Sequence, residues 1–214
     1  MLKIEPVLIL SLALAGVAGC ATTIDSRDFP ALHERREPIR RIAVVPFRAA
    51  GELARARAST TAVPASVATS LVARYLSEAL ALRGVAVVPA EDMSRVLAAD
   101  PSIDGRLVPR AVAELAAAKF GADAVLFGEV SRYEERRGQA AGATRPAAVG
   151  FEVTLYTAPG SEKLWSAVFS ETQQPLSSNV LSTTRYPGGG MRWLTAEELA
   201  RWGAEETVRA LPLQ

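Results

Sequence analysis

The chain has 214 residues, of which 49% are hydrophobic and 22% charged, and this composition suits about one globular domain. Its 24 basic and 23 acidic side chains leave a formal net charge of +1, which excludes the large positive field of a nucleic-acid binder. One cysteine excludes an internal disulfide and any site with several cysteine ligands, and one histidine leaves little for zinc chemistry or a histidine-based triad. We therefore expect no metal, no cofactor, no catalytic residues and no nucleic-acid partner.

The first twenty residues indicate export and lipid attachment. Residues 7–19 are almost all apolar or small, and thirteen helical residues reach only about 20 Å, short of a hydrocarbon core of about 30 Å. The segment therefore fits a cleaved signal peptide better than a membrane-spanning helix. The end of this segment and the next residue, Val17-Ala18-Gly19-Cys20, resemble the bacterial lipobox, in which an apolar residue and two small ones precede the cysteine that is acylated. We expect Cys20 to carry the lipid; an ordinary signal peptide that ends beside a buried cysteine is the alternative.

The residues after the cysteine predict how the protein is placed in the cell. Ala21 stands where inner-membrane lipoproteins of enteric-type bacteria often carry Asp, so the lipobox resemblance implies the periplasmic face of the outer membrane. Residues 21–40 are polar and charged without periodicity, which predicts a tether, and the exposed His33 within it is an unlikely catalyst. The expected organisation is a signal peptide over 1–19, a lipidated tether over 20–40 and a periplasmic domain over 41–214.

Apolar strands and amphipathic helices alternate after the tether. Short runs of apolar and β-branched residues, bounded by proline, glycine or polar residues, predict buried strands at 41–47, 85–89 and 122–133. Apolar residues at helical spacing predict helices at 64–83, 91–98 and 108–120, the first and last closed by a glycine. Residues 48–61 predict a polar loop, and residues 134–146, rich in Arg, Gly and Ala, predict a mobile hairpin loop.

The C-terminal part predicts an antiparallel hairpin and one more helix. Residues 151–156 alternate between apolar and polar, and a turn at 158–161 leads into a second strand of the same kind. Thr195 followed by Glu198 is the pattern of a capping box, which predicts a last helix to about residue 211. The order β-α-β-α-α-β-β-β-α predicts a single α/β sandwich domain, with a mixed sheet of four or five strands and helices mainly on one face.

Neither phosphate-binding, zinc-protease nor nucleophile-elbow motifs occur in the sequence. Paired acids such as Glu197 and Glu198 are more typical of a solvated helix face than of a catalytic site. A hydrolase that works through two carboxylates or a serine stays open as an alternative.

The segment 182–193 is the candidate contact surface. It contains Tyr186, Arg192 and Trp193, residue types that are enriched at the centres of protein interfaces, together with three consecutive glycines. We hypothesise that Tyr186, Arg192 and Trp193 contact a partner protein or a second copy of the chain. The structural alternative is that Trp193 is a hydrophobic staple before the capping box.

Five segments, taken in order, resemble one family of periplasmic domains. They read RIAVVPF, ALRGVAVVP, AAKFGADAVLFGEVSRYEER, FEVTLY and EKLWSAVFSET, and they cover residues 41–172. The succession is similar to the domain shared by the curli-secretion lipoprotein CsgG, the penicillin-binding-protein activator LpoB and the N-terminal domain of TolB, and to small lipoproteins of that superfamily. The long hairpins of the curli channel have no counterpart, because 134–146 and 182–193 are too short for barrel strands of about 9–11 residues each.

The resemblance implies a non-catalytic lipoprotein that scaffolds or regulates an envelope assembly or secretion machine through protein–protein contact. A narrower alternative is an activator of a peptidoglycan synthase, as LpoB is. Such an activator favours a long tether that reaches across the periplasm. The expected tether of about 20 residues spans at most about 70 Å, which counts against this alternative.

Overall fold

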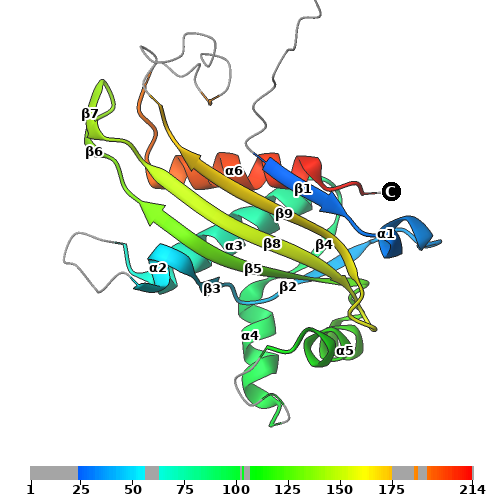
Figure 1. The fold of residues 1–214 in the computed structure, drawn as a ribbon. Coiled ribbons are helices and arrows are strands. Elements are labelled where there is room, and N and C mark those ends of the chain that lie inside the picture. Colours follow the sequence, from blue (N-terminus) through cyan, green and yellow to red (C-terminus); the bar gives the residue numbers. More distant parts are fainter. Residues whose placement is uncertain are drawn as a thin grey trace, which may run out of the picture.

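The apolar runs predicted as strands form the centre of a mixed sheet of seven strands in a computed structural model (Figure 1). The structure describes residues 24–55, 63–101, 103, 107–174, 186–187 and 192–213. The strands of the main sheet are β1 (Ile24–Asp28), β2 (Arg41–Val44), β3 (Arg48–Ala49), β4 (Ala86–Val88), β5 (Ala124–Glu134), β8 (Ala148–Thr157) and β9 (Lys163–Thr172). The helices are α1 (Pro30–Glu34), α2 (Gly51–Arg55), α3 (Ala65–Leu82), α4 (Ala90–Ala99), α5 (Pro109–Phe120) and α6 (Ala196–Ala210).

The sheet is parallel at one end and antiparallel at the other. Its order is β1-β9-β8-β5-β2-β4, with β3 paired to β5. The strand β2 runs parallel to both β4 and β5, whereas β5, β8, β9 and β1 pair antiparallel. A separate two-stranded hairpin, β6 (Arg137–Gln139) and β7 (Gly142–Arg145), extends from the β5 and β8 ends (Figure 1). The single mixed α/β domain expected from the sequence is confirmed.

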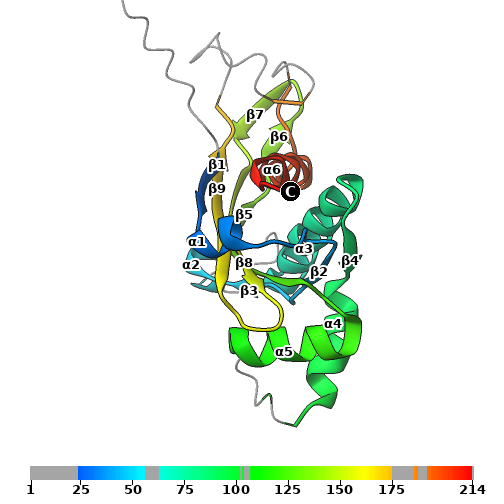
Figure 2. The same cartoon turned by 90° about the vertical axis from the view of Figure 1, so that its right-hand side faces the viewer.

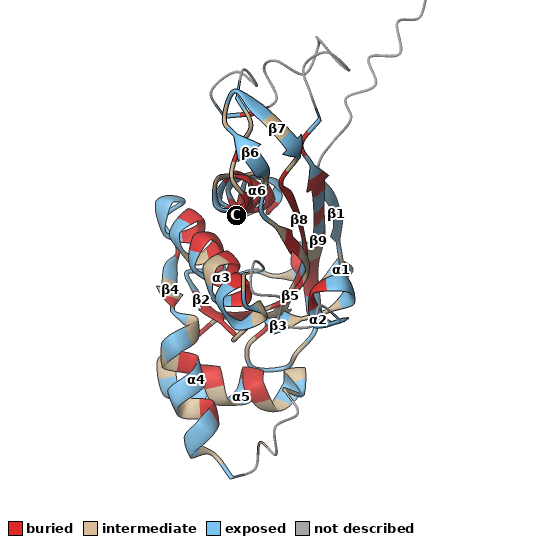
Figure 3. Cartoon of the chain, turned by 90° about the vertical axis from the view of Figure 1, so that its left-hand side faces the viewer, coloured by how far each residue is buried: buried red, intermediate tan, exposed pale blue. Residues whose placement is uncertain are grey.

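Helices cover both faces of the parallel part, which explains its continuous apolar runs. Ile42 and Val44 belong to the core that includes α3 and α6, whereas Ala43 and Val45 belong to the core that includes α4 and α5. All four side chains are fully buried, so this strand needs no polar face. Figures 2 and 3 show α3 and α6 together on one side of the sheet, with α4 and α5 near its lower end. The sheet is therefore larger, and covered more evenly at this end, than expected.

The first strand and helix correct the expected tether. Residues 24–28 form β1, which pairs along β9 from Ile24 opposite Phe169 to Asp28 opposite Trp165, and Leu32 of α1 is buried against the core. Only Ile24 of β1 is even partly buried, because an edge strand joins a sheet through backbone hydrogen bonds and needs no apolar pattern. A tether over 20–40 is therefore wrong for residues 24–34. His33 is exposed as expected, with Nε2 3.7 Å from Asp28 Oδ2.

Two glycines fit the close packing that surrounds them. Gly121 ends α5 in the left-handed region at φ 62°, where a glycine has no steric penalty. Gly128 lies inside β5, and a Cβ atom there would be 2.2 Å from the ring of Phe47. The aromatic ring therefore occupies the space that the side chain of any other residue would need.

Candidate functional site

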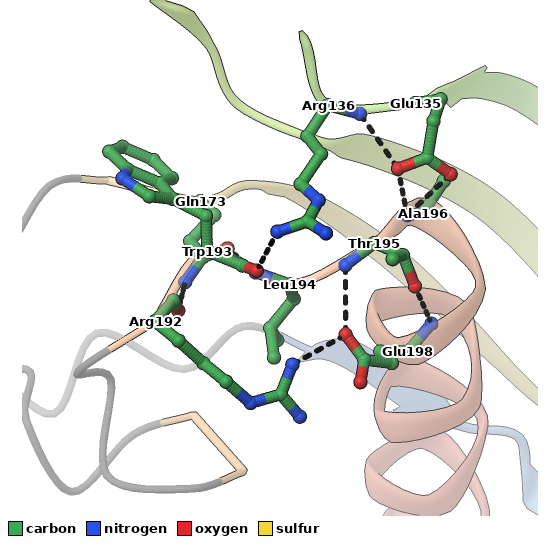
Figure 4. Close-up of polar contacts among 9 residues, drawn as sticks. All are labelled: Glu135, Arg136, Gln173, Arg192, Trp193, Leu194, Thr195, Ala196 and Glu198. Atoms are coloured by element: carbon green, nitrogen blue, oxygen red, sulfur yellow. Dashed lines mark hydrogen bonds and ion pairs between the residues drawn. The ribbon is translucent and has the colours of Figure 1, made fainter. Parts of the chain in front are cut away.

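Three separate parts of the chain meet the segment that precedes α6. They are the residues that follow β5, the first residue after β9 and the turn of the β6–β7 hairpin. We call this cluster the hairpin–helix junction; its members are Glu135, Arg136, Ala140, Gln173 and residues 192–198. Figure 4 shows the polar contacts that hold it together.

Gln173 is the centre of the junction. Its side chain is 2% exposed, and its amide is used in both directions. Oε1 accepts a 2.6 Å hydrogen bond from the backbone N–H of Leu194, and Nε2 donates a 2.9 Å hydrogen bond to the carbonyl of Arg192. The single side-chain amide of Gln173 therefore hydrogen-bonds two backbone groups of an irregular segment. In a β-sheet, a neighbouring strand would supply these hydrogen bonds.

The residues after β5 hold the same segment from the other side. The Glu135 carboxylate accepts from the backbone N–H of Ala196, at 3.3 and 3.2 Å from its two oxygens. Arg136 donates through a guanidinium nitrogen to the carbonyl of Trp193, at 2.8 Å. The backbone N–H of Trp193 in turn donates to the carbonyl of Ala140 in the hairpin turn, at 2.9 Å. The hairpin is therefore joined to the start of α6.

The start of α6 is stabilised by the capping box expected from the sequence. Thr195 Oγ1 accepts from the backbone N–H of Glu198 at 3.1 Å, and Glu198 Oε2 accepts from the backbone N–H of Thr195 at 2.9 Å. Arg192 donates to the same carboxylate oxygen at 2.8 Å. Its guanidinium first, and then the Thr195 hydrogen bonds, lower the pKa of Glu198 to about 2, although partial burial opposes the shift. The carboxylate is therefore ionised at neutral pH.

The predicted contact residues take three different positions. Arg192 is exposed and paired with Glu198, and Trp193 is partly exposed. Tyr186 is 5% exposed, with its ring 5.3 Å from that of Trp202 and its hydroxyl 2.6 Å from Glu171 Oε1. The prediction that Tyr186 contacts a partner is therefore corrected, because its side chain is packed inside its own domain. Cys20 lies outside the described residues, as do most positions between 175 and 191.

The sequence alone did not identify the other junction residues as part of a site. Gln173 and Glu135 lie directly after strands, and no motif distinguishes them from other polar loop residues. Leu194 carried a signal that was missed, because it occupies the position before the helix cap and Leu199 occupies the fourth helical position. Both are fully buried, so Leu194 rather than Trp193 occupies the staple position.

A second polar cluster lies on the open face of the sheet. Glu129 and Glu152 are directly opposite each other on β5 and β8, in a hollow of about 310 Å³ that Lys163 also lines. Arg48 donates to Glu129 at 2.7 Å, so one of the two carboxylates is engaged in an ion pair. These are the paired carboxylates that a hydrolase of the kind left open above would need.

The described part of the chain holds neither a cluster of metal ligands nor a helix able to span a membrane. Over those residues, no three histidine, cysteine, aspartate or glutamate side chains gather closely enough to hold a metal ion. Among the same residues, no helix combines the length and the hydrophobicity of a transmembrane segment.

Comparisons with known proteins gave weak structural similarity alone. No protein-family model and no curated protein matches the sequence. The chain is similar to a PelC dodecamer variant from Paraburkholderia phytofirmans at 17% identity, covering 87% of this chain and 96% of that one with a TM-score of 0.46. Lipoprotein GNA1162 from Neisseria meningitidis is 20% identical over 68% of this chain and 94% of its own, with a TM-score of 0.44. The LpoB C-terminal domain from Salmonella enterica is 21% identical over 67% and 90%, with a TM-score of 0.40. All three TM-scores lie below 0.5, so neither family nor function follows from them.

Proposed function

We propose that the chain is a non-catalytic lipoprotein, anchored through Cys20 to the periplasmic face of the outer membrane, that scaffolds or regulates envelope machinery through protein–protein contact. The observation that carries the proposal is the lipobox-like Val17-Ala18-Gly19-Cys20, which ends an apolar leader and contains the only cysteine. Two or three acyl chains, at about 0.8 kcal/mol per buried CH₂, hold a protein on a bilayer almost irreversibly.

The position of β1 supports a domain that stays close to the membrane. Cys20 precedes Ile24 by four residues, which span at most about 14 Å when fully extended. A domain held this closely suits a scaffold at the membrane surface. It disfavours the LpoB-like alternative, in which an activator reaches a peptidoglycan synthase from a long tether.

The polar side chains of the junction are engaged inside the domain, which counts against a catalytic role for them. Gln173, Glu135 and Glu198 all accept from backbone N–H groups of residues 194–196, so their polar atoms hold the chain in place. On the open face, Glu129 is paired with Arg48. The hydrolase alternative predicts that Glu129→Gln or Glu152→Gln abolishes a periplasmic activity, whereas the proposal predicts that neither variant changes envelope function beyond its effect on stability.

The anchor is tested by metabolic labelling with a clickable fatty acid. The wild-type chain should be labelled and recovered with the outer membrane. Cys20→Ser should leave an unlabelled precursor, because the thiol that accepts the lipid is absent. Thr22→Ser, a matched change two residues away, should label normally. Normal labelling of Cys20→Ser would overturn the proposed anchor.

The contact function is tested by site-specific photo-crosslinking in the native host. A photoreactive residue at Trp193, which is partly exposed at the junction, should give a discrete crosslinked product whose partner is identified by mass spectrometry. The same residue at Ala98, which is exposed on α4, is the matched control. Identical products from the two positions, or none from Trp193, would remove the junction as the contact surface.

A further inference from the structure

Two arginines lie directly opposite each other on the β6–β7 hairpin. Arg137 and Arg145 are register partners, and directly opposite residues of an antiparallel pair share one face. Both are exposed, and among the described residues neither guanidinium has an ion-pair or hydrogen-bond partner. Like charges directly opposite each other destabilise a strand pair, so the hairpin in isolation carries a repulsion that an anion would relieve.

The two carboxylates that directly precede the hairpin in the chain are already engaged. Glu134 pairs with Arg132, whose Nε lies 3.4 Å from Glu134 Oε1. Glu135 accepts hydrogen bonds from the backbone N–H groups of Ala196 and Arg136. Within the described part of the chain, Arg137 and Arg145 therefore have no counter-ion and remain an exposed, uncompensated pair.

The hairpin is held in a defined place. Gly138 has φ 103°, and a Cβ atom there would lie 2.6 Å from the carbonyl oxygen of Gly142. The close approach of the paired strands β6 and β7 at this position therefore requires a glycine. The hydrogen bond from Trp193 to Ala140 joins the hairpin to the start of α6. The two guanidinium groups are therefore presented from a fixed part of the domain.

The hairpin lies toward the same end of the sheet as the start of β1. Figures 1 and 2 both show β6 and β7 at the upper end and the start of β1 below them, near the level of α6. Ile24 pairs with Phe169, which pairs with Phe151, and Arg145 lies six residues before Phe151. At about 3.3 Å per residue, Arg145 reaches at most about 20 Å beyond the level of Ile24. The chain from Ile24 back to Cys20 allows up to about 14 Å, so a bilayer that holds Cys20 lies within reach of the arginine side chains.

We propose that Arg137 and Arg145 bind the anionic phosphate headgroups of the membrane that holds the lipid anchor, and so orient the domain on its surface. Arginine suits this role because its planar guanidinium donates two parallel hydrogen bonds to a phosphate. The attraction of a basic residue to an anionic surface falls off within a Debye length, so it acts only where an anchor keeps the residue close. This inference rests on the proposed anchor at Cys20.

The test uses the full lipidated chain in nanodiscs. Because acylation blocks the thiol of Cys20, Ala141→Cys gives a single labelling site in the hairpin turn, and Ala98→Cys gives a control site on α4. An environment-sensitive dye is attached to each, and quenching by a spin-labelled headgroup is measured in discs with and without 30% phosphatidylglycerol. We expect strong quenching at residue 141 in the anionic discs only, weakened by high salt, and little quenching at residue 98 in either.

Neutral variants test the two arginines directly. Each basic residue near an anionic surface accounts for about a fivefold preference, so Arg137→Gln with Arg145→Gln should lower the ratio of membrane-bound to free hairpin about 25-fold. Arg137→Lys with Arg145→Lys should retain most of it. The matched control is Arg95→Gln with Arg110→Gln, which removes two exposed charges on α4 and α5 and should change nothing.

The outcomes separate this inference from the proposed anchor. Chains that fail to stay on the discs would overturn both. Chains that stay on the discs with an unquenched hairpin, or with quenching unchanged by the glutamine pair or by the lipid charge, would overturn the headgroup contact alone. A hairpin dye that is shielded only when an envelope protein is added would also overturn it, in favour of a protein partner.

Discussion

Gln173→Met is expected to destabilise the domain far more than the loss of a polar side chain just after a strand would ordinarily do, because Gln173 is buried. The substitution keeps the length of the side chain and removes both hydrogen bonds. It therefore measures the loss of the hydrogen bonds without a large change in side-chain volume. It leaves the buried N–H of Leu194 without a partner, at a cost of about 1–3 kcal/mol, and removes a neutral bond to the Arg192 carbonyl that is worth about 1 kcal/mol. The expected loss is therefore about 3 kcal/mol.

The loss is measured by thermal and urea unfolding of the purified chain in detergent. For a domain of this size, 1 kcal/mol shifts the melting temperature by about 2–4 °C, so Gln173→Met should lower it by about 6–12 °C. Gln174→Met, one residue along and exposed, is the matched control and should change it by less than 1–2 °C. Hydrogen exchange at the Leu194 amide should accelerate only in the first variant. A loss below about 0.5 kcal/mol, or equal effects from the two variants, would refute the assigned role of Gln173.

Three further predictions concern other parts of the fold. Gly128→Ala should cost about 1–3 kcal/mol in urea unfolding, because a Cβ atom meets the Phe47 ring at 2.2 Å; Phe47→Leu should recover part of that loss, and a neutral Gly128→Ala would contradict the close packing. The lowered pKa of Glu198 means that its contribution is present above its ordinary pKa of 4.5 and is lost as the pH falls towards 2. Because its side chain is 38% exposed, we expect only about 1 kcal/mol of acid-dependent stability to vanish in Glu198→Gln, and an unchanged pH profile would count against the pair with Arg192. His33→Ala and treatment with EDTA should each leave the melting temperature unchanged, and a shift of several degrees on chelation would reveal a metal site.

The parts of the fold that local chemistry dictates could be predicted from the sequence. The apolar runs of β2 and β5 could be recognised in the sequence because helices bury both faces of the sheet there. Every residue of each run is therefore apolar. The start of α6 is readable because a capping box needs only residues three positions apart. The same locality applies to the lipobox, which a peptidase recognises as an extended peptide, and the lipidation of Cys20 stays a prediction because that residue lies outside the described part of the chain.

The candidate site could be predicted only in part. The sequence pointed to residues 182–193, but it did not distinguish the buried Tyr186 from the exposed Arg192, since both are common in interfaces. The difference is made by Trp202 and Glu171, which come from another helix and another strand. No single-sequence pattern encodes such a meeting, because residues far apart in the chain come together only when the sheet and α6 pack.

What the sequence alone determined about this protein is therefore its composition class, the succession of its long strands and helices, and the ends of its long helices, all of which depend on neighbours within a few residues. Tertiary structure decided the rest. It placed residues 24–28 at the edge of the sheet, because edge pairing uses the backbone and leaves no trace in the side chains. It brought Gln173 to the segment before α6, and it set Arg137 opposite Arg145, because strand register and long-range hydrogen bonds exist only once the whole sheet has formed.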